Sequence, residues 1–195
     1  MKLYDPLPDS IEWEGKTILL NLSFDRVLDA VDMTKDERFS DAAKTAYCLD
    51  GLCEGKHPQS VALLDAIFRL LFADDKKKKH KEKVIDFTQD RALIIAAFRQ
   101  AYGIDLVAER GHLHWQTFAD LLKGIPSGTR LAEVMEIRAR PMPAPTKYNA
   151  QERTRLAKLK AEFKIEQTEA ERQSNLQDDI RQMAMGLLPR AKRSE

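Results

Sequence analysis

Residues 86–138 hold most of the chain's unbroken apolar periodicity, and this pattern limits what the sequence can fold into. Apolar residues recur there at three- and four-residue steps, which places their side chains on one face of a helix. The pattern predicts three helices, at about residues 87–102, at 113–123 and after the turn at 125–128. Their apolar positions are Ile94, Ile95, Phe98, Ala101 and Tyr102, then Trp115, Phe118, Leu121 and Leu122, then Leu131, Val134 and Met135.

The first of these helices carries signals at both ends. We expect Asp86 to cap its start, because an aspartate there accepts backbone N–H bonds. Gly103 should end it, because glycine tolerates the left-handed conformation that closes a helix. Amphipathic helices joined by short loops must pack on one another to hide their apolar faces, so the stretch predicts a helical core that includes Trp115 and Phe118.

The sequence of the N-terminal part of the chain predicts a β-hairpin followed by more helices. Ile11 and Trp13 alternate with polar residues, residues 14–16 supply a turn, and residues 17–22 supply the returning strand. Ser23 is placed to cap a helix that follows. Further helices are expected at about residues 35–49 and 58–73. The predicted fold class is therefore mainly α, a compact helical domain with an N-terminal β-hairpin and a long C-terminal helix.

The rear of the chain begins with a segment that disfavours helix. Three prolines within residues 141–145 favour an extended linker. One long helical pattern then covers about residues 150–185. We therefore expect a helical core domain with its hairpin at 1–140, a proline-rich linker at 141–149 and a helical extension at 150–195. Two apolar patches on the extension are candidate partner-binding residues: Leu156, Leu159 and Phe163 in the first, and Leu176, Ile180, Met183 and Leu187 in the second.

Charge and hydropathy narrow the range of partners. Residues 1–58 carry 12 acidic and 7 basic side chains, whereas the rest of the chain is mildly basic. This asymmetry favours contacts between protomers, as a homo-oligomer, or with another protein over wrapping nucleic acid. No apolar run is long enough to cross a bilayer, and the first residues lack the apolar centre of a signal peptide. We expect a cytoplasmic protein that contacts no membrane.

The lysine-rich run at residues 74–83 is the strongest local charge feature. Its six lysines could bind phosphates. The run has no aromatic residues for stacking bases, however, and aspartates flank it. A solvated loop is the better interpretation, and no nucleic-acid partner is expected.

Two groups of side chains are candidates for chemical sites. Cys48, Cys53 and His57 are good zinc ligands, but a structural site needs four and no second pair completes this one. His112 and His114 have no acidic or nucleophilic partner at a spacing that suggests catalysis. We therefore expect no metal, no cofactor and no enzymatic activity, and a binding function is favoured instead.

Several motifs together resemble a family of tail assembly chaperones of long-tailed bacteriophages, which are encoded next to the tape-measure gene. In the core they are QDRALIIAAFRQAYGIDL, LHWQTFADLLKGIP and TRLAEVMEIRAR. On the N-terminal side, the resemblance extends to DPLPDSIEWEGKTILLNLSFDRVL. On the C-terminal side, it extends to PAPTKYNAQERTRLAKLKAEF. The lysine-rich run is longer and more charged than the family pattern, and the sequence from Lys164 onward departs from it.

The resemblance implies a non-enzymatic chaperone in the host cytoplasm that is absent from the mature virion. Such a protein would bind the tape-measure protein and help recruit tail-tube subunits. The alternative is a structural tail or head-connector component of the virion.

Overall fold

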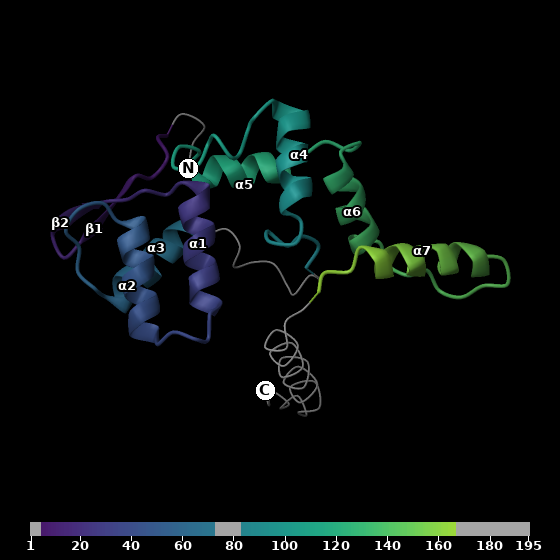
Figure 1. The fold of residues 1–195 in the computed structure, drawn as a ribbon, viewed down its shortest axis with the longest axis horizontal. Helices are drawn as coiled ribbons and strands as arrows, with labels where there is room; N and C mark the ends of the chain where they lie inside the picture. The colour runs from purple at the N-terminus through teal and green to yellow at the C-terminus, as the bar shows by residue number, and fades with distance from the viewer. Residues whose placement is uncertain (1–4, 73–82, 167–195) are drawn as a thin grey trace, which may run out of the picture. The chain divides into compact units, whose positions relative to one another are not determined.

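The computed structural model describes residues 5–72 and 83–166 and divides the chain into two compact units, Met1–Ala139 and Arg140–Glu195. The described part is mainly α, with one two-stranded sheet, as the sequence predicts (Figure 1). The first unit contains β1 Ser10–Trp13, β2 Lys16–Leu19, α1 Phe24–Lys35, α2 Asp41–Leu52, α3 Val61–Phe72, α4 Arg91–Tyr102, α5 Trp115–Lys123 and α6 Arg130–Ala139. The second contains α7 Ala150–Glu162.

The N-terminal hairpin joins β1 and β2 in antiparallel register, with Ile11 opposite Ile18 and Trp13 opposite Lys16. Its two turn residues, Glu14 and Gly15, have φ angles of 50° and 75°. Positive φ at both central positions marks the type I′ turn, whose twist matches that of the strands. The hairpin expected at this place is confirmed, and its face toward the helices includes the buried Ile18.

The segment after β2 is hydrogen-bonded on both sides. Asn21 N–H donates to the Leu52 carbonyl at 2.9 Å, so this segment runs beside the end of α2. Three residues later, Phe24 N–H donates to the Leu113 carbonyl at 2.9 Å, and Trp115 N–H donates to the Leu22 carbonyl at 2.7 Å. The segment therefore links the end of α2 to the start of α5.

Helices α1 and α2 pack side by side, and α2 also contacts α3 (Figure 1). Ser23 precedes α1 as expected, but its side chain makes no capping hydrogen bond. The second helix was expected from Lys35, which instead ends α1. Helix α2 begins at Asp41, because the Ser40 hydroxyl accepts the Ala43 N–H and starts the helix there.

Helix α4 starts later than the sequence predicts. The expected cap, Asp86, accepts the N–H groups of Thr88 and Gln89, which form turns before the helix. The N-cap residue is Asp90, whose side chain is held by Arg138 of α6 and makes no capping bond. The helix ends as predicted at Gly103, in the left-handed conformation with φ 69°.

Aromatic rings fill the centre of the first unit, and Phe118 of α5 lies among them. Its ring stacks on Phe24 at 4.9 Å between centroids and on Phe98 at 5.2 Å. The Trp115 ring lies 5.7 Å from it, and both side chains are buried, which confirms their predicted core position. The packed rings join α1, α4 and α5 into one core.

The second unit begins with the proline-rich segment, which Asn149 and Arg153 bind. The Asn149 amide donates to the Ala144 carbonyl at 2.9 Å, and the Arg153 guanidinium donates to the Pro143 carbonyl. Helix α7 ends at Glu162, where a helix continuing to about residue 185 was expected. Phe163 caps the helix, with its N–H donating to the Leu159 carbonyl, and Ile165 is buried just beyond it. Residues 167–195 lie outside the described part.

Candidate functional site

The first unit contains an open pocket of about 190 Å³ between α1, α4, α5 and the segment that connects α4 to α5. Seven of its side chains are apolar residues of the core or of its edge, one is an exposed valine, and three are charged. The lining residues are Phe24, Asp25, Leu28, Phe87, Arg91, Ile94, Ile95, Leu106, Val107, Arg110 and Phe118.

The floor of the pocket is fixed by core packing. Phe24, Ile94 and Phe118 are buried, and the ring stacking of Phe24 on Phe118 holds both in place. Phe87 closes one wall, with its ring centroid 6.1 Å from that of Phe118. Aromatic pairs at these distances are mutually stabilising, so the floor is a preformed apolar surface.

The connecting segment forms part of the rim, and Asp105 shapes it. Its carboxylate accepts the Val107 N–H at 3.0 Å, and its carbonyl accepts the N–H groups of Ala108 and Glu109. The hydrogen bond from the Val107 N–H is the largest of the effects that hold the pKa of Asp105 below its usual value. These turns bury Leu106 and leave Val107 48% exposed at the pocket edge.

Asp25 connects the rim to α1. Its carboxylate accepts the Gly111 N–H at 2.9 Å. Partial burial acts to raise the pKa of Asp25, but hydrogen bonds from backbone N–H groups, that of Gly111 foremost, bring it below its ordinary value. The side chain therefore stays ionised at neutral pH and is already engaged by the loop.

The two arginines of the rim differ from Asp25. Arg91 and Arg110 are exposed, and among the described residues neither guanidinium has a hydrogen bond or an ion pair. Together with Asp25 they give the rim a net positive charge. The site thus combines an apolar floor with two cationic groups available to a ligand.

The volume of the pocket limits what it can hold. Sites for cofactors and drug-sized molecules typically measure about 300–1,000 Å³. An apolar cavity of about 150 Å³ is enough for benzene. A pocket of 190 Å³ therefore suits one large apolar side chain.

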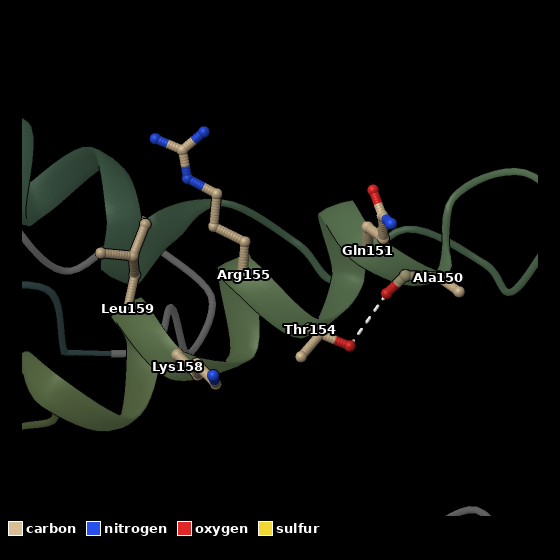
Figure 2. A pocket seen from close by; sticks show the side chains of 6 residues that line it. All are labelled: Ala150, Gln151, Thr154, Arg155, Lys158 and Leu159. Carbon is tan, nitrogen blue, oxygen red and sulfur yellow. Dashed lines mark hydrogen bonds between the residues drawn. The ribbon is translucent and has the colours of Figure 1, made fainter.

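A second, more open hollow of about 580 Å³ lies along α7 in the other unit. Figure 2 shows its six lining side chains, with Arg155 and Leu159 extending from the helix and the Thr154 hydroxyl bonded to the Ala150 carbonyl at 2.9 Å. Of the predicted partner-binding residues, Leu156 is buried, whereas Leu159 and Phe163 are half-buried. Leu176, Ile180, Met183 and Leu187 lie outside the described residues.

Cys48 and Cys53, the candidate zinc ligands, are core residues. The Cys48 thiol donates to the Ala30 carbonyl at 3.4 Å, and burial raises its pKa. Burial, with a smaller effect of Asp50, raises the pKa of Cys53 to about 11. Thiols with such pKa values stay protonated at neutral pH, the form that neither binds metals nor attacks electrophiles. Within residues 5–72 and 83–166, no group of three or more His, Cys, Asp or Glu could hold a metal ion.

The two histidines at the start of α5 bind the backbone. His114 is the N-cap: its Nδ1 accepts the Gln116 N–H at 3.0 Å, so its Nε2 carries the proton and donates to the Pro8 carbonyl at 3.1 Å. His112 Nδ1 donates to the Arg110 carbonyl at 2.9 Å. His114 thus starts α5 and anchors the proline-containing lead to it.

The lysine-rich run falls almost wholly outside the described residues. Its last member, Lys83, forms an ion pair with Asp86 at 2.8 Å. None of the helices that the structure describes combines the length and the apolar composition needed to cross a membrane.

Sequence reasoning placed the pocket floor in the core but did not predict a pocket. The missed residues are Asp25, Leu106, Val107 and the two arginines. One sequence signal was available: Arg91 precedes Ile94 and Ile95 by one helical turn, so a cation and two apolar side chains share a face.

A family model described as "Bacteriophage Gp15 protein" matches residues 3–165. Neither the curated proteins nor the solved structures contain a match to the chain.

Proposed function

Because the chain belongs to the Bacteriophage Gp15 protein family, we propose that it is a tail assembly chaperone, which binds the phage's tape-measure protein and helps recruit tail-tube subunits. The family model matches most of the chain, and the motifs quoted above give this chain its resemblance to tail assembly chaperones. The proposed role is non-enzymatic and belongs to the host cytoplasm, with the protein absent from the mature virion.

The observation that carries the proposal is the pocket of the first unit. It has the size of one apolar side chain, a rigid floor and an open, charged rim. A helix binds to another protein by inserting spaced apolar anchors into such sites. A chaperone that holds an apolar helical protein needs many modest contacts of this kind, because several copies along one chain add their affinities through effective concentration.

The C-terminal extension is proposed as a second contact. The half-buried Leu159 and Phe163, together with the patch at residues 176–187, would bind the tail-tube protein or another protomer. Ending the chain after Gln173 tests the second patch: loss of tail-tube binding or of oligomer mass in light scattering, with an unchanged melting temperature, is the expected result. Unchanged binding and mass would remove residues 174–195 from the proposal.

The function is tested by co-expression with the tape-measure protein of the same phage. We expect the two proteins to purify together and the tape-measure protein to stay in solution only when the chaperone is present. Mass spectrometry of purified virions supplies the second readout, with no copies of this chain expected. Stoichiometric copies in the virion would instead identify a structural tail or connector component.

A further inference from the structure

The pocket between α1, α4, α5 and residues 103–114 has two exposed arginines whose guanidinium groups bind no other residue that the structure describes. We propose that it is the docking site for an acidic amphipathic helix, which inserts one large apolar side chain and places carboxylates against Arg91 and Arg110. The identification of the partner as the tape-measure protein rests on the proposed function. The chemistry of the ligand follows from the pocket alone.

The apolar part of the ligand is set by the walls. Seven apolar side chains of the core or its edge line the pocket, and Val107 extends this lining to the surface at 48% exposure. The volume of 190 Å³ accepts a ring or a branched aliphatic side chain but not a nucleotide or another cofactor-sized molecule. Burying one such side chain supplies the gain that anchors a helix in a groove.

The acidic part of the ligand is set by the rim. Arg91 and Arg110 lack ion pairs within the described residues, whereas the Asp25 carboxylate is already hydrogen-bonded to the Gly111 N–H. A guanidinium binds a carboxylate through two parallel hydrogen bonds, which gives direction as well as attraction. A helix meets both requirements when its acidic residues lie three or four positions from the apolar anchor, since those side chains share its face.

A minimal ligand tests the chemistry without any partner protein. The compound 3-phenylpropanoate joins one phenyl ring to one carboxylate, and 3-phenylpropanol is its neutral counterpart. With methyl-labelled protein in NMR titrations, we expect shifts at Ile94, Ile95 and Val107 and a Kd of about millimolar, as the size of the compound allows. The neutral alcohol and the R91Q/R110Q variant should each give a Kd about five-fold weaker.

The partner is tested by capture of the co-expressed tape-measure protein on the full-length chain. R91E/R110E should retain at most about one tenth of the protein that the parent retains, because reversed charges repel an acidic helix. The matched control is K56E/R69E, which changes the net charge equally at exposed residues that do not line the pocket. Glutamate at position 91 falls in the first turn of α4, where a negative charge suits the helix, so the variant should fold.

The outcomes distinguish a failure of the docking proposal from a failure of the proposed function. Absence of shifts at the pocket methyl groups, or equal binding of the alcohol, would overturn the docking chemistry. Equal capture by the parent and R91E/R110E would reject the pocket as the docking site and leave the chaperone function standing. If the parent itself captured no tape-measure protein, the proposed function and the named partner would both fall, and the titration would still decide the ligand chemistry of the pocket.

Discussion

Arg138 and Asp90 form a buried ion pair through two hydrogen bonds, Nη1 to Oδ2 at 2.6 Å and Nη2 to Oδ1 at 2.9 Å. Their side chains are 10% and 4% exposed. Arg138 Nη1 also donates to the Val84 carbonyl, and Asp86 N–H donates to Asp90 Oδ2. The pair therefore joins the end of α6 to the turns that lead into α4.

Removing one partner of this pair should be strongly destabilising. R138M leaves the Asp90 carboxylate buried without its cation, and we expect the free energy of unfolding to fall by about 3–5 kcal/mol. Urea denaturation measures the change. R130M is the matched control, because the Arg130–Glu133 pair is exposed and such pairs contribute less than about 1 kcal/mol. Equal effects of the two substitutions would mean that burial adds nothing to the Arg138 pair.

Phe118 should be the aromatic residue whose truncation costs most. Its ring contacts those of Phe24, Phe87, Phe98 and Trp115, and F118A would leave a cavity among them. The expected loss of unfolding free energy is about 3–5 kcal/mol, with a smaller loss for F118L, which fills more of the space. Chemical denaturation of both variants checks this, and an F118A protein as stable as the parent would contradict the packing.

The buried thiols predict a loss of stability at alkaline pH. The pKa of Cys53 is about 11 in the folded chain, against an ordinary value of 9.0. Below pH 9.0 both states hold the proton and the thiol's contribution is complete. Between these two values the unfolded chain releases the proton while the folded chain keeps it, so stability falls as pH rises, by at most about 1.4 kcal/mol per pH unit.

Urea denaturation at several pH values across this window measures the slope. C53A should have a shallower alkaline decline than the parent, because the substituted chain has no proton to release at this position. Parallel declines in the two proteins would show that Cys53 makes no contribution to the pH dependence.

The hairpin turn should be improved by one substitution. Glu14 has φ 50°, a left-handed conformation that L residues other than asparagine and aspartate rarely adopt. E14N would give the Asn-Gly pair favoured in type I′ turns, and we expect about 0.5–1 kcal/mol of added stability. G15A should act in the opposite direction, because Gly15 has φ 75° although no neighbouring atom would crowd a methyl group. Melting temperatures of both variants test the turn, and a lower value for E14N would argue against it.

Features encoded by neighbouring residues were predictable from the sequence. Glu14 and Gly15 define the hairpin turn locally, and Gly103 ends α4 by its own conformational freedom. The start of α4 was misplaced because Asp90 and Arg138 are 48 positions apart, and no local pattern pairs them. Likewise, the sequence suggested that α2 begins at Lys35, since the Ser40 cap lies within a run that is apolar on one side.

The candidate site was predictable only in its floor. Phe118 and Ile94 follow helical periodicity and were placed in the core from that spacing. The rim depends on the turns around Asp105, which bring Val107 and Arg110 beside α1 and α4. Loop geometry of this kind arises from hydrogen bonds between particular side chains and backbone groups, and hydrophobic periodicity carries no information about it.

The chain segment after β2 has a consequence for synthesis on the ribosome. Its hydrogen bonds reach both Leu52 and Leu113, so its two sets of partners are made at very different times. A nascent chain that contains α1 and α2 can form the hydrogen bond to Leu52. It can form the hydrogen bonds near Leu113 only after the start of α5 has been synthesised. Contacts of such long sequence separation slow folding. We expect α1 and α2 to acquire their full stability only after residue 115 has left the exit tunnel.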